Sequence, residues 1–411
     1  MRIGMILDTI IGFPPDIRVE KEAKALSAAG HEVALLTRRL PEGAIEEEFS
    51  GRLGLRIVRV DIPQEEKGKI PVVKRALTML DERWEKAIYD FVRRFEIQIV
   101  HVHDWFLVLT ALKVSRSLDF PIVADLHEDL PAAMRSYRTR SGLWQRAAHA
   151  LRWNYHWMRH KEAGSLRQCS RTIVVVPEAV ERIIRYGVPK ERIVVVSNTE
   201  DETTFKYDPR AADSAVAAKY KDYWTASYVG GIQPHRGLDT ALRAVARVRA
   251  EIPNFLLLIV GARVMNRDWL FREIKRVGAA EAVEVIDWQP FSMVLSYVMA
   301  SDVCLIPHND TEHTQAAVPH KLFQYMICGK PVLVSSCKPL ARIVSSSNSG
   351  RIFKASDSES LAEQLIWMHT HRDRLEELGK NGRAAALGPF AWKHDAARLV
   401  DMYRSLEHEA R

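Results

Sequence analysis

The feature that most constrains the fold is an alternation of short apolar runs with helical patterns, which begins at the N-terminus. The apolar runs of the first half cover residues 2–7, 32–37, 55–60, 98–102, 121–125, 172–176 and 193–196. A helical pattern over 20–29 follows the first run and is closed by Gly30. This order is typical of βαβ units, which build a parallel sheet.

The same alternation starts again after a polar stretch, residues 199–223, that we interpret as a linker. The second set of apolar runs covers residues 224–229, 255–260, 283–286, 303–306 and 331–335, with a helix expected at 239–250. We therefore predict an α/β chain with two facing Rossmann-like, doubly wound domains, residues 1–200 and 201–389. A last helix, residues 390–411, is predicted from apolar residues spaced three to four apart. In such sheets ligands bind outside the carboxyl ends of the strands.

The composition is that of a globular chain. Its 411 residues are 47% hydrophobic and 27% charged, and the formal net charge is +7. Mild basicity favours anionic partners without choosing among them. No apolar run is long enough to span a membrane, and the N-terminus reads as a strand rather than a signal peptide. We expect a cytoplasmic protein.

The four cysteines are Cys169, Cys304, Cys328 and Cys337. No two of them have a CxxC spacing, so neither a zinc site nor a disulfide framework is expected. They are interpreted as buried thiols.

A glycine pair followed by a basic residue comes after the first strand of the second half. Gly230 and Gly231 let backbone N–H groups approach an anion, and Arg236 adds a cation near the start of the next helix. The pattern suits a pyrophosphate; the alternative is a tight turn with a surface arginine.

A second phosphate-type signal lies in residues 318–332. A helix is expected to begin near Pro319 and to end at Gly329, with Lys321 in its first turn. Gln324, one turn further, can hydrogen-bond a ribose diol. The same helix can also pack its apolar side chains in a core, and the two interpretations are compatible.

Histidines follow two strands of the first half. His127 comes after the run 121–125 and is expected to face a ligand, with a structural histidine as the alternative. His101 and His103 lie on the same side of the preceding strand. A metal pair there is possible, but we favour a structural or acceptor-side role and expect no metal.

The loop 308–315 consists of eight polar residues without glycine or proline. It is interpreted as a reader of sugar hydroxyls, with a solvated connector as the alternative.

Residues 135–161 are basic and contain no acidic residue. On a helix, Trp153 and Trp157 fall near Arg146, opposite an apolar stripe that includes Met158. This surface suits an anionic membrane or an amphiphilic acceptor; packing against another helix is the alternative. We place Trp153, Trp157, Arg146 and His103 on the acceptor or membrane side.

These segments together resemble the retaining glycosyltransferases of family GT4, which have the GT-B fold. The resemblance is carried by Phe13–Glu20, Ala28–Val33, Val196–Phe205, Arg236-Gly237, Lys321–Val332 and the helix with Trp392. It implies a nucleotide-sugar donor on the second domain and an acceptor on the first. It also implies that His127, Arg236 and Lys321 are catalytic, and that no cofactor or metal is needed. The implied donor-binding residues are Gly12, Gly230, Gly231, Arg263, Trp288, Glu312, Lys321, Leu322 and Gln324.

The chain departs from the family pattern at three positions. Ala316 and Gln324 replace two glutamates, and Gly231 replaces an arginine. Glu312 is a candidate substitute for the first glutamate.

We therefore expect a metal-independent enzyme that transfers a sugar with retention to a glycan or lipid-linked acceptor, in polysaccharide or glycoconjugate synthesis at the inner face of the membrane. No nucleic-acid partner is expected. The alternatives are a nucleotide-sugar epimerase and a non-catalytic partner protein on the same fold.

Overall fold

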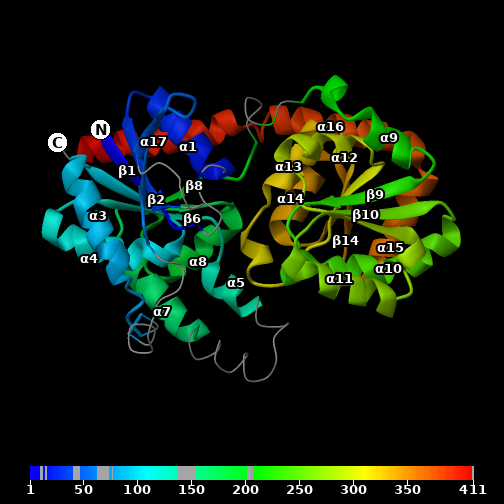
Figure 1. Cartoon of the computed structure of the whole chain (residues 1–411), viewed down its shortest axis with the longest axis horizontal. Coiled ribbons are helices and arrows are strands. Elements are labelled where there is room, and N and C mark those ends of the chain that lie inside the picture. The colour runs from blue at the N-terminus through cyan, green and yellow to red at the C-terminus, as the bar shows by residue number, and fades with distance from the viewer. Residues whose placement is uncertain are drawn as a thin grey trace. The chain divides into compact units, whose positions relative to one another are not determined.

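The computed structural model describes residues 1–9, 13, 16–39, 47–62, 74–75, 77–136, 153–200, 205 and 207–409, without the side chains of 136 and 264–266. The chain forms two compact units, each a sheet covered by helices (Figure 1). The first unit comprises Met1–Ser197 and Lys393–Arg411, and the second comprises Asn198–Trp392. The domain limits predicted from the sequence were residues 200 and 389.

The first unit contains an eight-stranded sheet in the order β3-β4-β2-β1-β5-β6-β7-β8. Its strands are β1 Arg2–Leu7, β2 Glu32–Arg38, β3 Glu47–Ser50, β4 Leu55–Val60, β5 Ile99–His103, β6 Ile122–Leu126, β7 Arg171–Val174 and β8 Ile193–Val195. All pairs are parallel except β3 with β4. The edge strand β3 was not expected, because its sequence Glu-Glu-Phe-Ser contains a single apolar residue, and that residue, Phe49, is exposed.

The strand order of the first unit reverses at β1, which lies between β2 and β5. Such a reversal leaves a crevice at the carboxyl ends of the two strands that flank it. Strands β5 and β6 are buried along their whole length, as expected for a sheet covered on both faces.

The helices of the first unit are α1 Ile17–Ala28, α3 Glu82–Arg94, α4 Val108–Leu118, α5 Leu130–Ser136, α7 Tyr155–Leu166, α8 Val180–Arg185 and α17 Trp392–Glu409. Helix α1 begins at the Asp16 N-cap, whose carboxylate accepts hydrogen bonds from the backbone N–H groups of Arg18 and Val19. This start turns Arg18 and Glu22, four residues apart, toward the interior, where both side chains are buried.

The C-terminal helix α17 returns to the first unit (red in Figure 1). The Tyr403 hydroxyl lies 2.9 Å from His101 Nδ1, and Asp395 Oδ1 accepts a 2.7 Å hydrogen bond from the Ser197 N–H. The family resemblance implies that the last helix crosses back to the N-terminal domain, and these contacts confirm it.

The second unit contains a six-stranded sheet in the order β11-β10-β9-β12-β13-β14, with every pair parallel. Its strands are β9 Trp224–Val229, β10 Phe255–Ala262, β11 Val283–Asp287, β12 Val303–Ile306, β13 Val332–Ser335 and β14 Gly350–Phe353. The order reverses between β9 and β12, so the loops after these two strands border the expected ligand crevice of this unit.

The helices of the second unit are α9 Ser214–Tyr220, α10 Leu238–Glu251, α11 Val264–Arg276, α12 Val294–Met299, α13 His320–Ile327, α14 Lys338–Ser347, α15 Ser358–Thr370 and α16 Leu375–Leu387. Helices α10 and α15 pack side by side (Figure 1). Their buried leucines, including Leu242 and Leu361, join Trp224, Tyr228 and Phe255 in one core. This core holds β9 in place, and the loop that follows β9 borders the expected ligand crevice.

Within the described residues, no helix is both long and apolar enough to cross a membrane. All four cysteines are free and buried, as the sequence predicted.

Candidate functional site

The loop after β9 begins at Gly230, whose φ of 137° favours glycine. A Cβ atom at this position would lie 2.5 Å from Lys321 Nζ. The Gly230 N–H donates a 2.8 Å hydrogen bond to the Val260 carbonyl, so it is not free for an anion as the sequence analysis expected. Gly230 instead provides space for Lys321. Gly231 is exposed, and a Cβ there would meet nothing within 4 Å.

Lys321 is the second residue of α13, so its backbone lies at the positive end of that helix. Its Nζ is shielded from solvent, has no hydrogen-bond acceptor among the described residues, and lies 3.6 Å from the centre of the Tyr228 ring. Burial and the charge of Arg236 lower the pKa of Lys321 well below its usual value. The ammonium group is thus placed where an anion would stabilise it.

Arg236 ends the short helical turn Pro234–Arg236 after β9. Its Nη1 lies 3.1 Å from His308 Nε2, and its buried Nε has no partner in the described part of the chain. No carboxylate of a described residue forms an ion pair with Arg236 or Lys321. Buried charges in proteins are normally paired, so two neighbouring cations without a carboxylate indicate a site for an exogenous anion.

Gln324 is buried, and its Nε2 donates a 2.8 Å hydrogen bond to Glu200 Oε2. Its amide is therefore already engaged by a carboxylate of the same unit. Leu322 is fully buried in the apolar interior, so its side chain is a core group rather than a ligand contact, contrary to the assignment from sequence. Only its backbone, in the first turn of α13, remains open to that role.

The other donor-side candidates are surface residues or lie outside the description. Glu312, Arg263 and Trp288 are exposed, Trp288 at 56%. Gly12 falls outside the described residues.

The loop 308–315 is folded, with Asp310 and Glu312 exposed. His308, His313 and Thr314 are buried. Asn309 Nδ2 donates to the Pro234 carbonyl and to Asp239, and Thr314 Oγ1 donates a 2.6 Å hydrogen bond to the Asn309 carbonyl. Several polar side chains of this loop therefore form hydrogen bonds within the loop or to the loop after β9.

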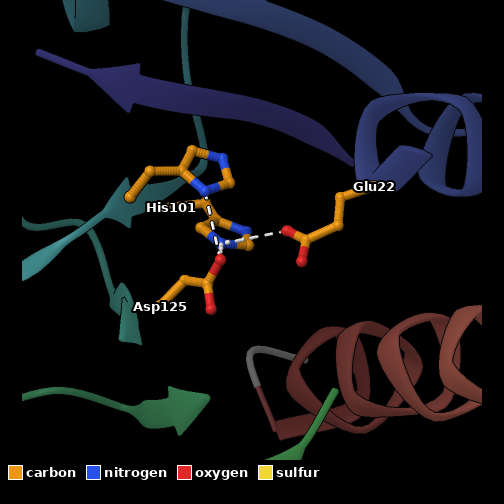
Figure 2. A group of neighbouring side chains, drawn as sticks. Glu22, His101 and Asp125 are labelled. Atoms are coloured by element: carbon orange, nitrogen blue, oxygen red, sulfur yellow. Dashed lines mark hydrogen bonds and ion pairs between the residues drawn. The ribbon is translucent and has the colours of Figure 1, made fainter. Parts of the chain in front are cut away.

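A second polar cluster lies in the first unit at the ends of β5 and β6. The register places His103 beside Asp125, and His101 lies two residues earlier on the same side, so that the two imidazoles stack with centres 4.4 Å apart. Glu22 Oε2 and Asp125 Oδ2 each lie 3.6 Å from His101 Nε2 (Figure 2). This confirms the predicted shared side of His101 and His103.

Arg18 neutralises this cluster. Its Nε and Nη2 donate to the two oxygens of Asp125 at 2.8 and 2.6 Å, and its Nη2 lies 3.0 Å from Glu22 Oε1. Burial would raise the pKa of Asp125, but Arg18 and His127 hold it well below its usual value. Arg18 was not among the residues predicted from the sequence. The available signal was an arginine one helical turn before Glu22, and both side chains prove to be buried.

The ligand atoms of Glu22, His101, His103 and Asp125 lie within 4.8 Å of one another, a spacing that suits a divalent cation. The guanidinium of Arg18 already occupies the carboxylates of this group. A metal ion would have to displace it, so the absence of a metal cofactor stays a prediction that this geometry favours.

His127 lies between two carboxylates. Its Nε2 is 3.0 Å from Asp125 Oδ2, and its Nδ1 is 3.6 Å from Asp104 Oδ2. Burial would lower the pKa of His127, but Asp104 and Asp125 raise it to about 10. Asp104 itself has a φ of 61°, which is strained for a residue other than glycine. The two carboxylates therefore favour the imidazolium form of His127.

The basic aromatic segment is described only in part, and Arg146 lies outside the described residues. Trp153 is half-buried, with its ring edge-on to Phe106. Trp157 is 38% exposed, its Nε1 donates to the Leu77 carbonyl, and Lys161 Nζ lies 4.5 Å from its ring centre. Met158 is buried, as the apolar stripe predicted.

The chain thus has two Rossmann-like units, and Lys321 and Arg236 stand at the strand-order reversal of the second. Residues 17–202 match the model described as Glycosyltransferase Family 4, and residues 209–385 match that of Glycosyl transferases group 1. Together the two matches span most of the chain, which belongs to this glycosyltransferase family.

The chain is 24% identical over 416 residues to a D-inositol 3-phosphate glycosyltransferase of Thermobispora bispora, covering 94% of this chain and 89% of the relative. It spans about half the length of other curated relatives of that name.

Among solved structures it resembles the sucrose-phosphate synthase of Thermosynechococcus elongatus, with a TM-score of 0.77, 20% identity and 99% of both chains covered. It also resembles Anabaena HepE in complex with UDP-glucose, with a TM-score of 0.72, 14% identity, and 98% of this chain and 100% of the other covered. These likenesses show the GT-B fold.

Proposed function

We propose that this chain is a metal-independent glycosyltransferase that moves a sugar, with retention, from a nucleoside diphosphate sugar to a glycan or lipid-linked acceptor. The observation that carries the proposal is the pair of cations, Lys321 and Arg236, that no carboxylate of the described residues compensates. UDP-glucose is the first donor to test, because a structural neighbour was crystallised with it.

The proposed donor cradle consists of Lys321, Arg236, Gly231 and the N-terminus of α13. In the transfer, the bond between the anomeric carbon and the phosphate oxygen breaks and the acceptor hydroxyl oxygen bonds to that carbon. Negative charge develops on the leaving diphosphate, which takes up the hydroxyl proton. The two fixed cations and the helix end stabilise that charge electrostatically.

His127 is the proposed catalytic group of the first unit. Asp104 and Asp125 favour the imidazolium form. Its Nε2–H is held by Asp125 at 3.0 Å, whereas Nδ1 lies 3.6 Å from Asp104, beyond hydrogen-bond distance, so the Nδ1–H is the donor proposed for a sugar oxygen. The proposal assigns it to the transfer step and not to nucleotide binding, so His127→Ala is expected to lower kcat while UDP affinity stays unchanged.

The acceptor is proposed to be membrane-proximal, with the enzyme in the cytoplasm at the inner face of the membrane. The support is the exposed indole of Trp157 with Lys161 beside it and Arg135 over Tyr155. Indoles flanked by basic groups suit an anionic lipid surface.

A thermal-shift screen against UDP, GDP, ADP, TDP and their sugars tests the donor assignment, since a ligand that binds only the folded state raises Tm. We expect a shift with one nucleoside diphosphate that Arg236→Ala removes. Arg247→Ala, which alters an exposed arginine paired with Glu359 in the same unit, is the matched control. No shift with any nucleotide contradicts the proposal.

Product analysis separates the enzyme classes. Release of nucleoside diphosphate that depends on an acceptor indicates transfer, whereas conversion of the donor alone indicates an epimerase.

A further inference from the structure

His308 is the second residue after β12 and stands beside the strand-order reversal of the second unit. It is 3% exposed. The family resemblance assigns it no role, and from sequence it was only the first residue of a polar loop. This buried imidazole lies next to the proposed donor cradle, and its contacts indicate what it does there.

The imidazole contacts Arg236 through Nε2, 3.1 Å from Nη1. A guanidinium can only donate hydrogen bonds, so His308 Nε2 must accept, and the ring proton must sit on Nδ1. The contact therefore requires a neutral histidine. Nδ1 is buried without a partner among the described residues, so nothing else in that part of the chain holds the ring in this tautomer.

The surroundings of His308 keep it neutral. The groups that face it are Arg236, Lys321, His235 and His313, with no carboxylate among them. Burial and these neighbours lower the pKa of His308 well below its usual value. Both effects favour the neutral imidazole, which is the form that accepts the hydrogen bond.

The two loops do not depend on this hydrogen bond to stay together. Gly237 has a φ of 70°, and a Cβ there would lie 1.6 Å from the Pro307 carbonyl oxygen, so the backbones already touch. The Asn309 N–H also donates a 3.0 Å hydrogen bond to the His235 carbonyl. Removal of the imidazole is therefore expected to leave the loops in place and to free Arg236.

We propose that His308 is a positioning residue, a neutral acceptor that orients the Arg236 guanidinium for a bound diphosphate without cancelling its charge. A carboxylate at this position would hold the guanidinium more firmly, but it would compete with the anion. An imidazole fixes the direction and leaves the charge available. The inference rests on the proposed donor cradle and adds a specificity for anions to it.

Three substitutions separate orientation from charge. His308→Gln keeps an acceptor, His308→Leu removes it, and His308→Glu keeps it but adds a negative charge. We expect UDP affinity, measured by calorimetry, to fall roughly 3- to 10-fold in His308→Leu, as for the loss of one hydrogen bond, and to stay within about threefold of the native value in His308→Gln. His308→Glu is expected to bind more weakly than His308→Leu, although it restores the hydrogen bond.

A double-mutant cycle with Arg236→Ala completes the test. If His308 acts through Arg236, His308→Leu has no further effect in the Arg236→Ala background. Additive losses, or UDP binding by His308→Glu as tight as native, overturn the inference. Urea unfolding of the unliganded variants checks the fold, and the Gln and Glu variants decide the question if His308→Leu does not fold.

Inorganic pyrophosphate is titrated in parallel. If the native chain binds pyrophosphate but not UDP, the nucleotide assignment fails. The double-mutant cycle of His308 and Arg236 is then measured with pyrophosphate and still tests the role of His308. If it binds neither, the donor cradle and the role of His308 fall together.

Discussion

The two polar clusters of this molecule lie at equivalent places, the strand-order reversal of each sheet, but they balance charge in opposite ways. In the first unit Arg18 is surrounded by Asp125 and Glu22, and His127 lies between Asp104 and Asp125. In the second, Arg236 and Lys321 contact an imidazole and a phenol ring.

A compensated cluster is complete without a ligand and can hold a catalytic group in one orientation and protonation state. An uncompensated cluster is unfavourable until an anion arrives. The difference indicates that the cluster of the first unit positions a catalytic group and that the cluster of the second unit binds an anion. The two clusters should therefore respond to mutation in opposite ways.

The largest expected effect is on stability, in the first unit. Asp125→Asn leaves the buried guanidinium of Arg18 without its main counter-charge, so the free energy of unfolding should fall by roughly 3–5 kcal/mol. Urea denaturation measures it. Asp401→Asn, which breaks the exposed pair with Arg404, is the control and should cost less than about 1 kcal/mol. Equal losses for the two variants would show that the cluster is not held by its charges.

The opposite pattern is expected in the second unit. Arg236→Ala removes a cation that has no counter-charge in the described residues, so stability should be unchanged or slightly higher. UDP affinity should fall roughly 10- to 100-fold, because a charged hydrogen bond to the ligand is lost. Calorimetry and urea denaturation on the same preparation test both statements. A destabilised variant with native affinity for UDP would reverse the contrast between the units.

A smaller effect is expected on the number of protons taken up when UDP binds. Because burial lowers the unbound pKa of Lys321 and a diphosphate would raise it, UDP binding should take up protons between the unbound and the bound pKa of Lys321, where the diphosphate is fully ionised. Affinity should then decrease as pH rises above the unbound pKa of Lys321.

Calorimetry in two buffers of different ionisation enthalpy measures this uptake. Lys321→Met should abolish it. Lys330→Met is the matched control, because the Lys330 ammonium already donates to the carbonyls of Met299 and Ser301. Proton uptake that persists in Lys321→Met would move the titrating group elsewhere.

The same linkage predicts the stability of the unliganded chain. Because the folded pKa of Lys321 lies below its unfolded value, the unfolded state binds more protons between the two values, and stability rises with pH across that window. Lys321→Met should flatten this rise.

The smallest effect is expected at the basic aromatic segment. Trp153→Ala with Trp157→Ala should weaken binding to anionic vesicles only a few-fold, because Trp153 is half-buried and the Trp157 indole N–H is already bonded to Leu77. Vesicle sedimentation measures it, and UDP affinity should not change. If the native chain does not bind such vesicles, the membrane role is wrong.

Much of the fold could be predicted from the sequence, because long runs buried in parallel sheets are nearly continuous in apolar residues, as in β10. The polar edge strand β3 and the short strand β14 were missed, since neither carries such a run. The spacing of Leu399 and Tyr403 predicted the helix α17, whereas its return to the first unit was implied only by the family resemblance.

The site was less predictable, because charge balance depends on groups that are distant in sequence. Lys321 and Arg236 could be selected from glycines and helix starts. The sequence does not show that these two cations lack a carboxylate partner or that Arg236 contacts His308. Both facts depend on the contact between the loops after β9 and β12. Arg18 and Asp125, 107 positions apart, were likewise joined only by the fold.

The most direct test is a crystal structure of the chain soaked with UDP. We predict a diphosphate within hydrogen-bonding distance of both Lys321 Nζ and the Arg236 guanidinium, with His308 Nε2 still accepting a hydrogen bond from Arg236. A diphosphate bound elsewhere, or a soaked crystal in which Lys321 still faces only Tyr228, would contradict it.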